Sequence, residues 1–385
     1  MKIRSLSLRN FRNLKEVDLE FVEGINVFVG LNGSGKTSLL EALNVISTGR
    51  SFRTSATKKI VSYEEDSFVL FTTLARNKGG QRSQLDISAN SEYRLGIEKG
   101  RDGSSDVKLN GQKSKSISAI TKLLPIQILA PDVENVLTGD RETKRSFMDW
   151  GVFHVEHSFF NVWKESKQII KIRNSVLRGF KQGEARADYK LIEPWDIQIS
   201  ELEKELNSKR CSYIEAYNES LEEIADLYFE AAPPFKLSLD YRPGWNREAY
   251  DSYKECLAEN FQSDTELGYT KLGPHRSYVE VFLDGGITRD TLSRGQEREI
   301  IFLLKLAQST HLKKSSEKTV LFLIDDIQAE LDSKKIEFIL SVLKKLDSQI
   351  LITCLEDITE NAQFGLKKNE IKLFHVEHGT IREAV

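Results

Sequence analysis

The sequence of 385 residues lacks any apolar stretch long enough to cross a membrane. Its longest apolar runs, Val320 to Ile324 and Ile300 to Leu304, are far shorter than the roughly 20 residues that a membrane-spanning helix needs. The first residues alternate between polar and apolar types, unlike the continuous apolar core of a signal peptide. We therefore expect a cytoplasmic protein with no membrane partner.

Closely spaced cysteines and a strong net charge are also missing. Cys211, Cys256 and Cys354 are widely scattered, which argues against a zinc site or a disulfide framework and favours buried free thiols. With 55 Lys and Arg residues against 58 Asp and Glu residues, the formal net charge is −3. A uniformly basic nucleic-acid-binding coat is thus excluded, and any such surface must be a local patch.

A glycine-rich loop lies between a predicted buried strand, Ile25 to Val29, and a predicted amphipathic helix, Lys36 to Ile46. The residues from Gly30 to Thr37 fit the pattern G-x-x-x-x-G-K-[ST] at every fixed position. Glycines let the backbone wrap a phosphate without Cβ clashes, and N–H groups at a helix start attract the anion. A plain glycine-rich turn is the structural alternative. The candidate ATP-binding residues are Gly30, Leu31, Asn32, Gly33, Ser34, Gly35, Lys36, Thr37 and Ser38.

Two carboxylates end a second predicted buried strand, Val320 to Ile324. The Mg²⁺ that Thr37 would ligate has to be held from the other side of the site as well, and Asp325 is the predicted partner through water. Asp326 would polarise the attacking water, while Lys36 would reach the β- and γ-phosphates, so these two are the catalytic candidates. Helix capping is an alternative role for such terminal acids, but the phosphate loop favours the metal site.

A third motif is the segment from Leu292 to Glu297, which precedes an apolar helix. Its Ser293, Gly295 and Gln296 resemble the signature motif of ABC-type ATPases. The resemblance implies that the serine and glycine contact the γ-phosphate of an ATP molecule bound by a second subunit, and helix N-termini favour anions. ATP would then be sandwiched in an ATP-dependent homodimer. Ala329 to Asp332 stands where that class has its D-loop.

Nearly the whole chain resembles the RecF family of bacterial recombination and gap-repair proteins, which is related to the heads of the Rad50 and SMC ATPases. Four segments carry this resemblance together with the ATPase motifs: Arg9 to Asn13, Gly49 to Thr54, Ala130 to Arg141, and Gly273 to Arg276. They occur in the family's order, and such a set is highly specific.

The fold that we expect is an α/β, P-loop ABC-type ATPase head of mixed sheets and helices with an inserted helical arm domain. Between about Phe153 and Glu230, two long helical patterns each carry an apolar stripe, which two antiparallel helices would bury against each other. We therefore assign residues 1–150 and 265–385 to the head and residues 151–264 to the arm. The basic and acidic faces of the arm helices are either solvated surfaces or contacts for DNA and protein.

The resemblance implies an ATP-dependent DNA-binding protein of recombinational gap repair, replication restart, DNA damage repair and the SOS response. The ATP-induced homodimer would bind double-stranded DNA near single-strand gaps, and slow ATP hydrolysis, as a switch, would release it. RecR and RecO are the implied partners, and RecA loading is the implied outcome. A compact basic run, Arg50, Arg53, Lys58 and Lys59, is the candidate DNA contact, with a solvated loop as its alternative.

The sequence departs from wider ABC-type patterns at several positions. The strand Ile350 to Cys354 lacks a switch histidine, and Thr353 is our candidate for sensing the γ-phosphate there. Gln127 is interpreted as a strand residue instead of a Q-loop glutamine. Asp326 stands where many relatives of this class have glutamate, and its shorter reach fits slow hydrolysis.

Three alternative functions stay open at this point. A transporter's ATPase subunit would share the phosphate and signature motifs but would lack a long helical arm. A P-loop ATPase effector of an overcoming-lysogenization-type defence system would need a further acidic nuclease domain. A kinase-like phosphotransferase would not need Ser293.

Overall fold

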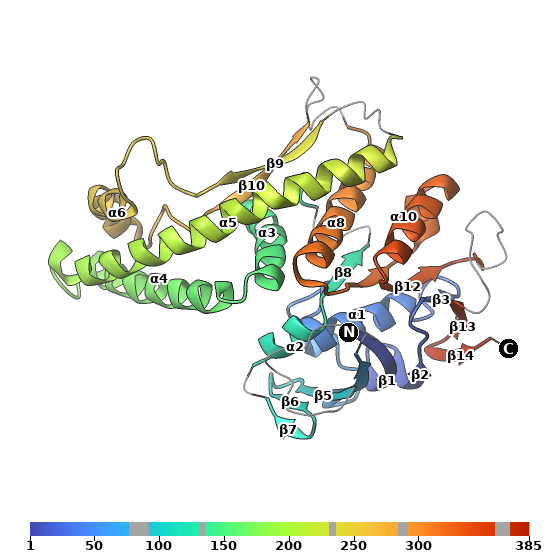
Figure 1. Ribbon diagram of the computed structural model, residues 1–385. Coiled ribbons are helices and arrows are strands. Elements are labelled where there is room, and N and C mark those ends of the chain that lie inside the picture. The colour runs from blue at the N-terminus through green and yellow to red at the C-terminus, as the bar shows by residue number, and fades with distance from the viewer. Residues whose placement is uncertain are drawn as a thin grey trace. The chain divides into compact units, whose positions relative to one another are not determined.

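A computed structural model of the chain describes residues 1–76, 92–114, 116–130, 135–230, 236–283, 292–358 and 370–384. The chain divides into two compact units, one of Met1–Val133 with Arg294–Val385 and one of Glu134–Ser293 (Figure 1). The second unit is longer than the predicted arm, 151–264, at both ends. It also contains residues 134–150 and 265–293, which we assigned to the head. No helix in the described ranges is long and apolar enough to span a membrane.

The first unit contains an antiparallel sheet in the order β2-β1-β4-β5-β6-β7. Its alternating apolar positions, such as Phe68, Leu70 and Leu74, are buried, whereas Val69 and Phe71 between them are partly exposed. The strands are β1 (Lys2–Phe11), β2 (Leu14–Glu20), β4 (Ser67–Ala75), β5 (Glu92–Gly100), β6 (Ser105–Leu109) and β7 (Gln112–Lys113).

A second sheet of the same unit has the order β14-β13-β3-β12-β11-β8, and all its pairs are parallel except β13 with β14. Its central strands are mainly apolar and are buried along almost their whole length, because both faces of a parallel sheet are covered. The strands are β3 (Ile25–Val29), β8 (Ile126–Leu129), β11 (Leu321–Ile324), β12 (Gln349–Cys354), β13 (Ile371–Glu377) and β14 (Thr380–Glu383).

The helices of the first unit supply the covering layers and follow the predicted periodicity. The predicted stripe of α1, Leu39, Leu40, Leu43 and Ile46, is fully buried. The helices are α1 (Lys36–Thr48), α2 (Ser118–Leu123), α8 (Arg294–Ser316), α9 (Ile327–Glu330) and α10 (Ser333–Lys345), with a short 3₁₀ turn, Thr57–Lys59.

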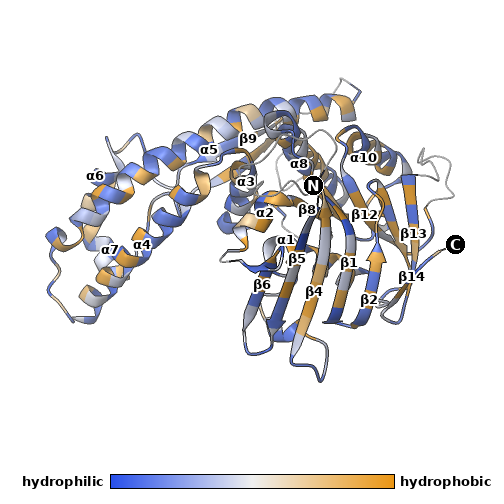
Figure 2. Cartoon of the chain, turned by 60° about the horizontal axis from the view of Figure 1, so that its bottom comes forward, coloured by the Kyte–Doolittle hydropathy of each residue, from blue (hydrophilic) through white to orange (hydrophobic). Residues whose placement is uncertain are grey.

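The second unit is built on two long helices, α4 (Phe159–Gln182) and α5 (Glu193–Tyr228), which pack against each other as predicted. Both helices alternate hydrophilic and hydrophobic residues in Figure 2, which fits the burial of one stripe on each. This unit also contains a two-stranded sheet, β9 (Leu237–Arg242) with β10 (Tyr278–Leu283), and the helices α3 (Arg141–Val155), α6 (Tyr253–Glu259) and α7 (Phe261–Leu267).

Candidate functional site

The glycine-rich loop connects the end of β3 with the start of α1, at the carboxyl edge of the parallel sheet. Gly35 stands at the helix N-cap with φ 121°, a conformation that residues with a Cβ rarely adopt. A Cβ on Gly30 would lie 2.2 Å from the carbonyl oxygen of Val376 in β13, so only glycine fits there. The fixed glycines of the motif are therefore required by this backbone.

Lys36 is buried, and its Nζ donates to the carbonyl oxygens of Gly30 and Leu31, the latter at 3.1 Å. The ammonium group thus lies over the loop that precedes it. Ser34 Oγ is also buried and has no hydrogen-bond partner among the described residues. Leu31, in contrast, is 79% exposed. An anion in this loop would meet a buried cation, a free hydroxyl and the N-terminus of α1, which is the donor set that a phosphate needs.

Two acidic residues and two threonines meet beside the loop. Thr37 Oγ1 lies 2.8 and 3.1 Å from the two carboxylate oxygens of Asp325, which follows β11. Thr353 of β12, the strand between β3 and β11, donates to Asp325 at 2.6 Å and accepts from the backbone N–H of Asp326 at 2.8 Å. One threonine hydroxyl therefore connects both acids.

The oxygen atoms of Thr37 and Asp325 fit a magnesium ion, because Mg²⁺ prefers one or two protein oxygens together with substrate phosphates and water. Asp326 fits a different role. It has a left-handed backbone, with φ 49°, and its Oδ1 is buried without a partner among the described residues. Such an unsatisfied carboxylate oxygen at a site is an acceptor for a water molecule or a proton.

The segment Arg9–Asn13 forms hydrogen bonds with the glycine-rich loop and with α1. Asn13 accepts a hydrogen bond from Ser38 at 2.9 Å and donates to the carbonyl oxygen of Gly33 at 3.4 Å. Arg12 forms two hydrogen bonds, of 2.7 and 2.9 Å, with the fully buried carboxylate of Glu41 in α1. The predicted binding residue Ser38 therefore uses its hydroxyl to fix this support.

Cys354, at the end of β12, is a buried thiol, and burial raises its pKa to about 12. It is therefore protonated and unreactive at neutral pH, as the scattered cysteine pattern led us to expect. Gln127 in β8 donates to Gln308 of α8 at 2.7 Å, so it bonds to the covering helix, consistent with its interpretation as a strand residue.

The signature segment begins directly before α8, with Ser293 exposed and Gly295 and Gln296 exposed in the first helical turn. Exposure leaves these atoms accessible to a nucleotide held by another subunit. In the D-loop segment, Asp332 caps α10 by accepting from the N–H of Lys335 at 3.1 Å. The side chains of Ala329 and Glu330 lie outside the described residues, as do Pro131 to Val133 of the third family segment.

The four candidate DNA contacts, Arg50, Arg53, Lys58 and Lys59, are all exposed. Within the described ranges no carboxylate pairs with their side chains, so their charges are available to an anion. A fifth cation, Lys99, donates to the carbonyl oxygen of Gly49 at 2.5 Å. Burial, together with the charge of Arg50, lowers the pKa of Lys99. The arrangement is a local basic patch on a chain whose net charge is negative.

Arg276 of the fourth family segment lies over the ring of Tyr269, with 5.8 Å from Cζ to the ring centroid. It belongs to the second unit, whereas the sequence-based division placed it in the head. Two near-identical sequence segments, 153–157 and 374–378, lie at the end of α3 and at the end of β13, respectively.

Comparisons with known proteins cover the whole chain. Residues 2–382 match the family model of the RecF/RecN/SMC N-terminal domain. The chain is 33% identical over 383 residues to the DNA replication and repair protein RecF of Aliivibrio fischeri, with 100% of both sequences covered.

Two solved structures, one of a RecF protein and one of an Smc head domain, are similar to this chain in fold. The recombination mediator protein RecF-ATP in the RecFOR pathway is 25% identical with a TM-score of 0.84, and the match covers 100% of this chain and 98% of that one. The Smc head domain derived from Pyrococcus furiosus is 19% identical with a TM-score of 0.54, over 100% of this chain and 96% of that one. The predicted α/β ATPase head with an inserted arm is thereby confirmed.

Proposed function

The chain belongs to the RecF family, within the larger RecF/RecN/SMC group, and from this premise we propose that it is an ATP-binding, DNA-binding protein of DNA replication and repair. The observation that carries the proposal is the contact of Thr37 with Asp325 beside the phosphate loop, with Thr353 connecting both acids. Those residues lie in or directly after the neighbouring strands β11 and β12 and in α1, which follows β3, and their relative placement suits one triphosphate with its metal ion.

The roles of the residues follow from their chemistry. The loop residues Gly30 to Ser38, which include Lys36, bind the phosphates. Thr37 of the same segment would hold Mg²⁺ together with Asp325. The metal, when bound, neutralises charge that develops on the phosphate oxygens. Asp326 accepts a proton from the attacking water, and its free Oδ1 supports this role.

The exposed signature residues support an ATP-dependent homodimer. Ser293 and Gly295 of one subunit would contact the γ-phosphate held by its partner, so the nucleotide itself would join the two copies. The basic patch of Arg50, Arg53, Lys58 and Lys59 would then contact the backbone of double-stranded DNA near a gap. Slow hydrolysis would reverse the assembly, with RecR and RecO as partners and RecA loading as the outcome.

The first test separates nucleotide binding from dimer formation. Lys36→Ala should lose affinity for ATP by at least tenfold in a titration calorimetry experiment, since the buried cation is removed. Ser293→Arg should bind ATP normally but stay monomeric in light scattering with ATP, whereas the exposed arm variant Ser175→Arg should dimerise like the wild type.

Two results would contradict the proposal. Unchanged ATP affinity in Lys36→Ala would remove the site, and an ATP-induced dimer of Ser293→Arg would remove the contact between subunits. A gel-shift assay on gapped duplex DNA, with ATP and with a non-hydrolysable analogue, tests the DNA-binding part separately.

A further inference from the structure

The second unit contains a small open pocket that the ATPase chemistry does not use. It has a volume of about 230 Å³, and its walls are mainly carbon atoms. We call it the arm pocket. Its lining residues are Lys167, Ile170, Lys171, Asn174 and Arg178 of α4, with His275 from the segment before β10.

Cations surround an apolar floor in the arm pocket. Ile170 is almost fully buried, whereas Lys171 and Arg178 are exposed, about two helical turns apart on one face. Neither of these two side chains makes an ion pair with any residue that the structure describes. The first methylene groups of Arg178 pack close to Gly268, which follows α7.

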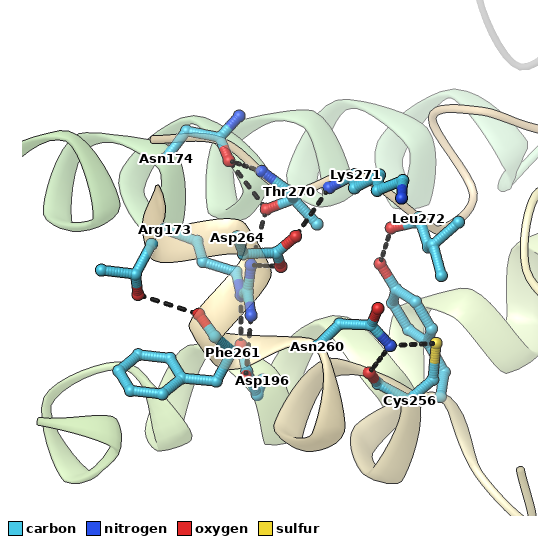
Figure 3. Close-up of polar contacts among 12 residues, drawn as sticks. Arg173, Asn174, Asp196, Cys256, Asn260, Phe261, Asp264, Thr270, Lys271 and Leu272 are labelled. Carbon is cyan, nitrogen blue, oxygen red and sulfur yellow. Dashed lines mark hydrogen bonds and ion pairs between the residues drawn. The ribbon is translucent and has the colours of Figure 1, made fainter. Parts of the chain in front are cut away.

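The polar donor of the pocket is oriented by a buried network. Arg173, fully buried, bonds to Asp196 and Asp264 at 2.6 Å each and to Thr270 at 2.8 Å (Figure 3). The N–H and the hydroxyl of Thr270 both donate to the side-chain amide oxygen Oδ1 of Asn174, each at 2.7 Å.

Because that oxygen is occupied, the NH₂ group of Asn174 points the other way, as Figure 3 shows. Nε2 of His275 lies 3.0 Å from the carbonyl oxygen of the same Thr270. Since a carbonyl can only accept, this nitrogen carries the proton, and Nδ1 is buried without a partner in the described part of the chain. Both polar groups are therefore fixed before any ligand arrives.

The chemistry of a ligand follows from these features. A cavity of about 150 Å³ holds a benzene molecule, so the arm pocket has room for one large apolar side chain. A phosphodiester would use the cations but not the carbon walls. A nucleobase would need an aromatic platform, and the only ring in the lining is that of His275.

We propose that the arm pocket binds an acidic peptide segment of a partner protein, with one aromatic or large aliphatic side chain inserted over Ile170. Carboxylates on both sides of that side chain pair with Lys171 and Arg178, and a backbone or side-chain carbonyl of the peptide accepts from Asn174. The apolar insertion supplies affinity, and the flanking charges supply orientation and specificity.

The test uses fluorescein-labelled hexapeptides and the full-length protein in a polarisation titration. The first probe is Asp-Glu-Asp-Phe-Asp-Glu, the second has Ser in place of Phe, and the third is the uncharged Asn-Gln-Asn-Phe-Asn-Gln. We expect the second and third probes to bind at least fivefold more weakly than the first, because each loses one of the two interactions.

Variants then locate the binding. The double variant Lys171→Glu/Arg178→Glu should weaken the first probe about tenfold, whereas Lys204→Glu, an exposed charge reversal on α5, should leave it unchanged. Both changes are at exposed positions, so the fold is preserved, and ATP affinity should be equal in all three proteins.

Three outcomes would overturn the proposal. The first is equal affinity for the Phe and Ser probes, which would mean that charge alone is recognised. The second is equal probe binding by wild type and the double variant. The third is a double variant that loses affinity for duplex DNA while its peptide affinity is unchanged, which would assign these cations to a nucleic-acid surface.

Discussion

At the scale of residues, Thr353 controls the geometry of the acidic side of the site. Its hydroxyl donates to Asp325 and accepts from the N–H of Asp326, and its side chain is fully buried. The sequence singled out Thr353 only as a candidate for sensing the γ-phosphate. The structure shows contacts to both acids, so we expect Thr353 to position the proposed metal ligand, Asp325, and the proposed proton acceptor, Asp326.

Thr353→Val tests this role. The substitution keeps the volume but leaves the N–H of Asp326 without its acceptor, and a carboxylate displaced by about 1 Å can cost a factor of about 100 in rate. We expect the ATP hydrolysis rate to fall 10- to 100-fold with less than a threefold change in ATP affinity.

The matched control is Thr353→Ser, which retains the hydroxyl and should recover most of the rate. If Thr353→Val hydrolysed ATP as fast as the wild type, the two hydrogen bonds would have no role in positioning the acids.

His275 gives a prediction about pH. Burial lowers its pKa from 6.5 to about 4, and the neighbouring Arg276 and Arg145 act in the same direction. The His275 ring binds a proton more readily in the unfolded chain than in the folded one. It therefore contributes stability that is present above pH 6.5 and is lost as the pH falls towards 4.

Urea unfolding at pH 7 and pH 5 measures the effect. Between pH 7 and pH 5, the free energy of unfolding of the wild type should fall by about 2 kcal/mol more than that of His275→Gln. One unit of difference between pKa and pH corresponds to roughly 1.4 kcal/mol. Glutamine can keep the donor to Thr270 but does not titrate. Equal losses in the two proteins would show that His275 is not the group responsible.

At the scale of elements, the arm helices are joined by a buried charge network as well as by their apolar stripes. Arg173 of α4 forms ion pairs with Asp196 of α5 and Asp264 of α7, and Tyr189 before α5 has its pKa raised to about 12, first by burial and then by Asp196. The apolar stripes indicated that the two helices pack together. The network could not be predicted, because Arg173 looks like one more charge on a basic helix.

Arg173→Met should destabilise the protein by about 3–5 kcal/mol, since it leaves two carboxylates buried without a cation. Chemical denaturation monitored by circular dichroism gives this number. The exposed Lys164→Met on the same helix should stay within about 0.5 kcal/mol of the wild type.

The triple variant Arg173→Met/Asp196→Asn/Asp264→Asn should regain part of the loss, because no uncompensated charge is left. A single variant Arg173→Met that was as stable as the wild type would mean that the network carries no net energy.

At the scale of the whole molecule, the local motifs were predictable and their long-range partners were not. The glycine pattern identified the loop from Gly30 to Thr37, and the buried strand with terminal acids identified Asp325, because both signals are contiguous. Glu41, in contrast, is fully buried and bound by Arg12 and Ser51. Those partners lie in separate segments before and after α1, so no local pattern could pair them.

The proposed DNA contact of the basic patch leads to a prediction for the protein with bound ATP. Affinity for duplex DNA should fall steeply with salt and depend little on sequence, because the expected contacts are to phosphates. The double variant Arg53→Ala/Lys58→Ala should lower the slope of log affinity against log salt by about 2, whereas Lys204→Ala should not change it. A salt-independent affinity would disprove this electrostatic mode.

Gly30 lies against Val376, and β3 pairs with β12 on one side and β13 on the other. The loop is therefore synthesised early, but the strands that enclose it are synthesised last. At ribosomal speeds of roughly 5–20 residues per second, an incomplete chain exists for tens of seconds without a finished nucleotide pocket. Until β12 and β13 have been made, the chain lacks both strands that pair with β3 and the carbonyl oxygen of Val376 against which Gly30 lies.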